Sequence, residues 1–161
     1  MQSLQTAVNE YYKQLRNGNI QFAYKGIISF ISTLKIQLEK KHPEYYTSGL
    51  YNGYMDMTYF GFTPLALKEK KLKVAIVFLH EEGRFEVWLS GINRGVQSEY
   101  IHKLKTIDIG KYKLSIPNPG VDSIVESVLE ANPNFDNPID LNRKIEERIL
   151  QFIEDMIKLL P

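Results

Sequence analysis

Residues 72–80, Leu-Lys-Val-Ala-Ile-Val-Phe-Leu-His, are followed after Glu82-Gly83 by residues 84–91, Arg-Phe-Glu-Val-Trp-Leu-Ser-Gly. Every position from 74 to 79 is apolar, which is typical of a strand covered on both faces. The second stretch alternates apolar and polar residues, so the two together predict a β-hairpin with strands over 72–80 and 84–91. A two-residue turn would place Phe78 opposite Val87 and Ile76 opposite Leu89.

Alternation along the predicted hairpin divides its side chains between two faces. Phe85, Val87 and Leu89 share one face with Ile76 and Phe78. The other face combines the apolar side chains of Ala75, Val77 and Leu79 with those of Arg84, Glu86, Trp88 and Ser90. One face is therefore expected to be core, and the other is a candidate surface.

Helical periodicity dominates the chain before this hairpin. Apolar residues at helical spacing predict one helix over 3–17 and a second over 20–41. Gly18 provides a left-handed stop between them, and Pro43 ends the second helix. Because the link is so tight, we expect the two helices to form an antiparallel hairpin.

The sequence predicts further strands and helices before and after the hairpin. The sequence predicts strands over 54–62 and 111–116, and a helix over 94–104 capped by Asn93. Ser123 and Glu126 have capping-box spacing, which predicts a short helix there. Asn137 followed by Pro138 predicts the start of a last helix that runs to Leu160. Its apolar stripe is expected to be core, with a seam for a partner helix as the alternative.

These elements predict an α+β fold in a single domain over residues 1–161. The expected sheet is mostly antiparallel and has four strands, over 54–62, 72–80, 84–91 and 111–116. The N-terminal helical hairpin and the C-terminal helices are expected to pack mainly on one face of it. The strand order is left open.

Composition excludes several classes of protein. The 161 residues contain no cysteine and only three histidines, so no thiol nucleophile, disulfide or cysteine-ligated metal is possible, and we expect no metal or cofactor. The net charge of +1 disfavours a nucleic-acid partner held by bulk electrostatics. The longest apolar run, 74–79, is far too short to cross a membrane. With no export signal at the N-terminus, a cytoplasmic location is expected.

The aromatic and polar residues around the hairpin are the best candidates for a site. Trp88 is the only tryptophan, and tyrosines crowd the segment before the hairpin. Aromatic rings mixed with charged groups are typical of binding surfaces. We therefore expect a non-enzymatic domain that binds a small molecule or a protein through Tyr54, Asp56, Arg84, Glu86, Trp88 and Ser90. The alternative is that a helix covers Trp88 as part of the core.

A metal-dependent hydrolase or nuclease is the competing interpretation. Asp56 and Glu86 could hold a divalent cation if their strands lie close together. The residue two positions after Glu86 is Trp88, however, where the familiar nuclease pattern has lysine. A structural role for both acids is the simpler interpretation.

Three segments carry a resemblance to a known family: Tyr-Met-Asp-Met-Thr-Tyr-Phe at 54–60, Leu-Lys-Val-Ala-Ile-Val-Phe at 72–78, and 84–91 of the hairpin. Together with Asp-Ser-Ile at 122–124 and Asn-Pro-Asn-Phe at 132–135, they resemble an uncharacterised bacterial family, a domain of unknown function. The resemblance spans nearly the whole chain. It implies a small cytoplasmic bacterial protein and no activity.

Overall fold

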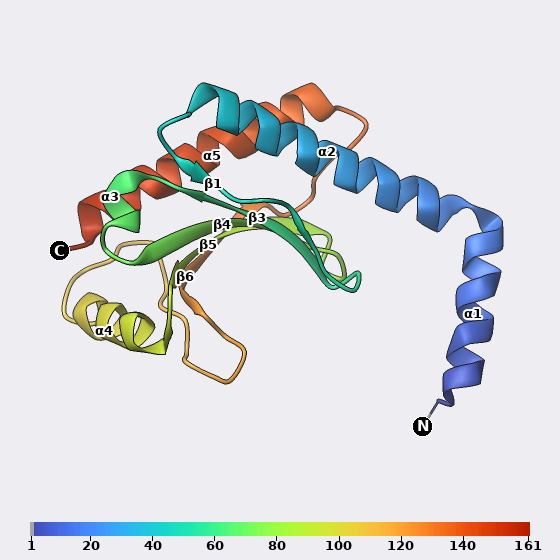
Figure 1. Ribbon diagram of the computed structural model, residues 1–161, viewed down its shortest axis with the longest axis horizontal. Coiled ribbons are helices and arrows are strands. Elements are labelled where there is room, and N and C mark those ends of the chain that lie inside the picture. Colours follow the sequence, from blue (N-terminus) through green and yellow to red (C-terminus); the bar gives the residue numbers. More distant parts are fainter. Residues whose placement is uncertain (1) are drawn as a thin grey trace.

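The computed structural model describes residues 2–161 and has an α+β architecture, as expected (Figure 1). Its elements in chain order are α1 (Leu4–Asn17), α2 (Asn19–Lys41), β1 (Tyr46–Thr47), β2 (Tyr51–Asn52), β3 (Met57–Thr63), α3 (Leu65–Lys68), β4 (Leu72–Leu79), β5 (Arg84–Gly91), α4 (Arg94–Leu104), β6 (Ser123–Glu130) and α5 (Pro138–Leu159).

The sheet is antiparallel throughout, in the order β1-β3-β4-β5-β6, and β2 also pairs with β3. The expected count of four strands is thus slightly too low. Three predicted strands correspond to β3, β4 and β5, although β3 begins at Met57 and not at residue 54. The short strands β1 and β2 cover the outer edge of β3.

The prediction for the last strand was wrong. Residues 111–116 form only an isolated bridge, between Leu114 and Val125. The strand is β6, where Ser123 and Glu126 had predicted a helix. The Ser123 hydroxyl does donate to the Glu126 carboxylate, at 2.5 Å, but on an extended backbone. The β-branched residues of β6 fit a pleated surface, and pairing with β5 buries Ile124 and Val125, which outweighs the local capping signal.

The register of the β4–β5 hairpin differs from the prediction by two residues. Phe78 lies opposite Phe85 and Ile76 opposite Val87, because the connection spans residues 80–83. A shift of two residues leaves every side chain on its predicted face, since the side-chain period of a strand is two. The division into a core face and a second face is therefore confirmed.

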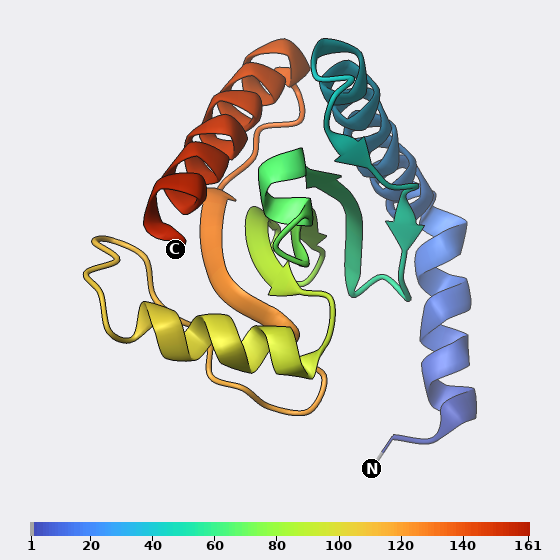
Figure 2. The same ribbon diagram turned by 60° about the vertical axis from the view of Figure 1, so that its left-hand side comes forward.

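Helices α2 and α5 pack side by side on the core face of the sheet (Figures 1 and 2). They bury an apolar stripe each against the aromatic and aliphatic side chains of β3, β4 and β5. The stripe of α5 is core as expected: its buried apolar residues are Leu141, Ile145, Ile149, Phe152, Ile153 and Met156. Only Ile157 of the predicted stripe is exposed, at 42%.

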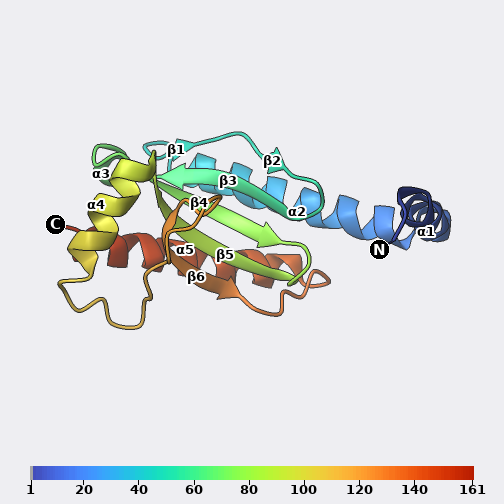
Figure 3. The same cartoon turned by 90° about the horizontal axis from the view of Figure 1, so that it is seen from below.

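Helix α1 does not form the expected hairpin with α2. It extends away from the N-terminal end of α2, and none of its residues is buried (Figures 1 and 3). Gly18 alone separates the two helices, with a positive φ of 80°. Antiparallel neighbours need a loop of about two to five residues, so a single residue cannot return the chain along α2.

The two asparagines predicted to begin helices, Asn93 and Asn137, differ in whether their side chains form a capping hydrogen bond. Asn93 caps α4 as predicted, since its side chain accepts from the backbone N–H of Val96. Asn137 occupies the position before α5, but its side chain makes no capping hydrogen bond.

Among residues 2–161, no helix has the length and apolar character that crossing a membrane requires.

Candidate functional site

The second face of the sheet, which we call the Trp88 face, lies opposite α2 and α5. Strand pairing sets its side chains in rows: Tyr59, Val77 and Glu86 form one row, and Ala75 and Trp88 belong to the next. On this side of the sheet, α4 crosses only near the end of β5, where the chain passes from Gly91 into that helix (Figure 2). Among residues 2–161, no other helix covers this face (Figure 3).

Glu86 is the fixed centre of the Trp88 face. Although charged, it is only 4% exposed. One carboxylate oxygen, Oε2, accepts from Arg84 Nε at 2.5 Å, and the other, Oε1, accepts from Trp88 Nε1 at 2.8 Å. This ion pair and hydrogen bond compensate the burial of the charge, and the bond to Glu86 raises the pKa of Arg84. Both neighbours are held in place while remaining partly exposed, with 39% of the Arg84 side chain accessible.

Of the six residues predicted for the site, four belong to this face: Arg84, Glu86, Trp88 and Ser90. Ser90 is buried at 8% exposure. Tyr54 and Asp56 instead lie in the loop before β3, where Tyr54 is 96% exposed. The Asp56 carboxylate accepts from the Tyr54 backbone N–H at 2.8 Å, so it shapes this loop. Backbone hydrogen bonds, first that of Met57, lower the pKa of Asp56.

Asp56 and Glu86 are not brought together. Tyr59 lies level with Glu86 across β4, and Asp56 precedes Tyr59 by three residues. Strand geometry then separates the two acids by about 10 Å along the sheet and about 10 Å across it. Carboxylates so far apart do not share a cation. Across residues 2–161, no group of three or more potential metal-ligating side chains is found.

One pair of side chains has the geometry of a nucleophile and a base. Thr58 Oγ1 lies 2.8 Å from His80 Nε2. His80 packs between the rings of Tyr24 and Phe78, and burial lowers its pKa, although the nearby Asp56 charge acts in the opposite direction. Thr58 is only 1% exposed, so its hydroxyl is closed to a substrate. The pair is a polar contact at the edge of the core.

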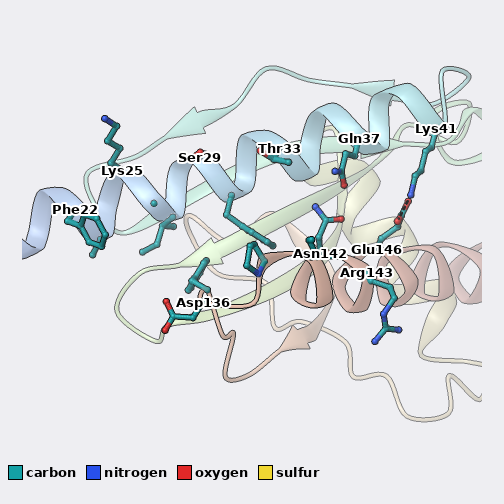
Figure 4. Close-up of a pocket in the computed structure, with 17 residues that line it drawn as sticks. Phe22, Lys25, Ser29, Thr33, Gln37, Lys41, Asp136, Asn142, Arg143 and Glu146 are labelled. Carbon is teal, nitrogen blue, oxygen red and sulfur yellow. Dashed lines mark hydrogen bonds and ion pairs between the residues drawn. The ribbon is translucent and has the colours of Figure 1, made fainter.

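A groove of about 1100 Å³ runs between α2 and α5 on the outside of the helical layer (Figure 4). The two helices run in the same direction here, with Phe22 and Asp136 near one end and Lys41 and Glu146 near the other. An ion pair of 2.9 Å between Lys41 and Glu146 crosses this second end. We call this feature the α2–α5 groove.

Sequence reasoning missed the α2–α5 groove. Phe22 and Ile139 line it and are 84% and 85% exposed, which is unusual for large apolar side chains. Both lie outside the buried stripes of their helices. A large apolar residue outside the apolar stripe of its helix is the only sign of the groove in the sequence. The two residues become part of one surface only when the helices pack together.

Asn142 is the most enclosed polar group of the groove. It is 8% exposed and lines the groove from α5 (Figure 4). The groove therefore presents a polar amide beside apolar side chains.

The architecture is that of an antiparallel sheet with one helix-covered face and one aromatic-polar face. A family model described as "Domain of unknown function (DUF7000)" matches residues 4–160, so the chain belongs to that family. Neither the curated proteins nor the solved structures contain a match to this chain.

Proposed function

We propose that this protein is a non-enzymatic binding domain and that the Trp88 face is its binding surface. The observation that carries the proposal is the arrangement around Glu86, which is 4% exposed and holds both the indole of Trp88 and the guanidinium of Arg84. A surface whose side chains are fixed before binding loses little conformational entropy when a partner arrives.

The chemistry of the face favours a partner with a flat apolar or aromatic group. Trp88 and Tyr59 offer ring surfaces, and Tyr51 packs beside Tyr59 with 4.8 Å between ring centroids. Arg84 uses its Nε for Glu86, which leaves its terminal amino groups free to donate hydrogen bonds to a carbonyl or carboxylate of the partner. An apolar or aromatic side chain of a protein, next to a backbone carbonyl, meets both requirements.

The sequence-based alternative, a metal-dependent hydrolase, has no support from the positions of Asp56 and Glu86. The cytoplasmic location and the bacterial origin expected from the sequence remain predictions, as does the organisation as one domain.

Small aromatic probes test the proposal. Indole and benzamide are titrated into ¹⁵N-labelled protein, and backbone and indole N–H shifts are followed by NMR. We expect the shifts to cluster on β3, β4 and β5 and at Trp88 Nε1, and to disappear in Trp88→Ala. Leu65→Ala, which removes a side chain that is 62% exposed on α3, is the matched control and should bind as the wild type does.

Fluorescence gives a second measurement on the same face, because Trp88 is the only tryptophan. Its emission should be quenched by acrylamide and protected when the probes are bound. Probe shifts confined to the α2–α5 groove, with Trp88 emission unaffected, would show that the binding surface has been misassigned.

A further inference from the structure

We propose that the chain forms a two-fold dimer in which α1 of each copy lies in the α2–α5 groove of the other. The proposal is independent of the Trp88 face, which lies on the opposite side of the sheet. It rests on two unpartnered surfaces of one chain and on the length of the link between α1 and α2.

The first surface is the apolar stripe of α1. Leu4, Tyr11 and Tyr12 are 81%, 56% and 49% exposed, and Val8 and Leu15 complete the stripe. An amphipathic helix of 14 residues gains most of its stability from packing that stripe against another element. Within residues 2–161 of a single copy, no such element lies beside the length of α1 (Figures 1 and 3).

The second surface is the α2–α5 groove. Phe22 and Ile139 stand exposed at its rim, and Phe30 and Phe135 belong to its lining. Along α2 the lining extends from Phe22 to Lys41, which corresponds to about 28 Å of helix, and α1 is about 21 Å long. The groove is therefore long enough to hold the whole of α1.

The link between α1 and α2 excludes the copy's own α1 from its groove. Gly18 is the single residue between the helices, and it directs α1 away from the body of the protein (Figure 3). Two helices packed side by side have axes about 8–10 Å apart, and antiparallel neighbours need about two to five linking residues. A second copy of the chain has no such restriction.

The area of the two surfaces agrees with this occupant. Covering Tyr11, Tyr12 and Phe22 in both halves of the dimer removes on the order of 700 Å² from water. Leu4 and Ile139 add to this, which brings the interface towards the roughly 1,200 Å² that stable complexes bury. Two-fold symmetry forms the same contact twice, because α1 of each copy lies in the α2–α5 groove of the other.

Sedimentation and light scattering measure the association. At about 100 µM we expect a mass of twice 18.7 kDa, with micromolar or tighter dissociation. Tyr11→Asp on α1 and Ile139→Asp in the groove should each weaken dimerisation by about tenfold or more. Neither side chain supports the fold of a single copy, so circular dichroism should be unchanged. Ile116→Asp is the control, since Ile116 is 76% exposed outside both surfaces, and it should dimerise as the wild type does.

Crosslinking identifies the contact. The chain has no cysteine, so a bis-maleimide joins only introduced ones. Tyr12→Cys and Ile139→Cys are prepared as separate proteins, and we expect crosslinked dimers to form several-fold faster in their mixture than in the Ile139→Cys protein alone. A monomer at about 100 µM would overturn the proposal, and so would a dimer that shows no excess of the mixed crosslink or that persists unweakened in both aspartate variants.

Discussion

Glu86 decides the character of the Trp88 face at the scale of single residues. Its two carboxylate oxygens are shared between Arg84 and Trp88, one on each side along β5. Period-two spacing predicted that these three side chains share a face, and the structure confirms it. Which of them would be buried was not predictable, because burial of Glu86 depends on the neighbouring strands.

Replacing Glu86 with alanine should lower the free energy of unfolding by about 2–3 kcal/mol, because it leaves the guanidinium of Arg84 and the indole N–H of Trp88 without their acceptor. Chemical denaturation measures the change. Glu82→Ala is the control, since Glu82 is exposed in the hairpin connection and should change stability by less than about 0.5 kcal/mol. Equal effects of the two substitutions would contradict the role given to Glu86.

His80 should make stability depend on pH. Burial lowers its pKa below the ordinary value of about 6.5, so near that pH the unfolded chain binds more protons than the folded one. Its contribution is therefore complete above about pH 6.5 and is lost as the pH falls through the folded-state pKa.

Denaturation between pH 7.5 and pH 5 should show this loss, and His80→Gln should reduce it while keeping a hydrogen bond to Thr58. His102→Gln removes an exposed histidine of α4 and serves as the control. If His80→Gln leaves the pH dependence of the wild type unchanged, His80 does not titrate as described.

At the scale of elements, the two predicted helix caps show that a local sequence pattern can mark a helix start without determining its capping hydrogen bond. Asn93 and Asn137 both precede helices, and the sequence predicts both as caps. Only Asn93 makes the capping bond, 2.9 Å from its Oδ1 to the N–H of Val96. The backbone of Asn137 has φ of −123° and ψ of 69°, and its side chain accepts no hydrogen bond from the first turn of α5.

Asn93→Ala should therefore cost about 1 kcal/mol of stability, and Asn137→Ala should cost only a few tenths. Both values come from the same denaturation experiment, so each substitution serves as the control for the other. The reverse order of the two losses would show that α5 starts with a side-chain cap after all.

Substitutions in the buried apolar stripe of α5 should lower stability by more than the loss of a helix cap does. Phe152 is 2% exposed and packs edge-on against Tyr112, with 5.6 Å between ring centroids. Phe152→Ala should cost about 3–5 kcal/mol, because a cavity remains where the ring was. Ile157→Ala, on the exposed side of the same helix, should cost less than about 1.5 kcal/mol. A small loss at Phe152 would mean that α5 does not hold the core together.

At the scale of the whole molecule, the arrangement of faces separates the two proposed surfaces. The helices α2 and α5 cover one side of the sheet and form the groove on their outer side, and the Trp88 face lies on the other side (Figure 2). Partners could therefore occupy both surfaces at once without competing.

Divalent cations should not stabilise the protein, because Asp56 and Glu86 do not converge and no other cluster of ligands occurs among the described residues. Magnesium or manganese at millimolar concentration should leave Tm unchanged in a thermal shift measurement. A ligand that binds the folded state raises Tm by mass action, so an increase abolished by Asp56→Asn and by Glu86→Gln would restore the hydrolase hypothesis.

The sequence alone was sufficient for the α+β class, the central hairpin, the two faces of its strands and the boundaries of the long helices. Each of these depends on side-chain periodicity within one segment, and the period of a strand or helix is a local property. The pattern around Trp88 was predictable for the same reason. It is a period-two array along the single strand β5.

The remaining features could not be predicted from periodicity. The β4–β5 register follows from the connection over residues 80–83, and the direction of α1 from the single-residue link at Gly18. The pairing of β6 with β5 and the α2–α5 groove depend on how segments far apart in the chain pack together. In β6, pairing with β5 outweighed the capping signal of Ser123 and Glu126. Phe22 and Ile139 line the same groove although they are more than one hundred positions apart in the chain. Local sequence patterns do not report contacts between distant segments. Where the two conflict, the energy of tertiary packing exceeds the differences in propensity on which the patterns depend.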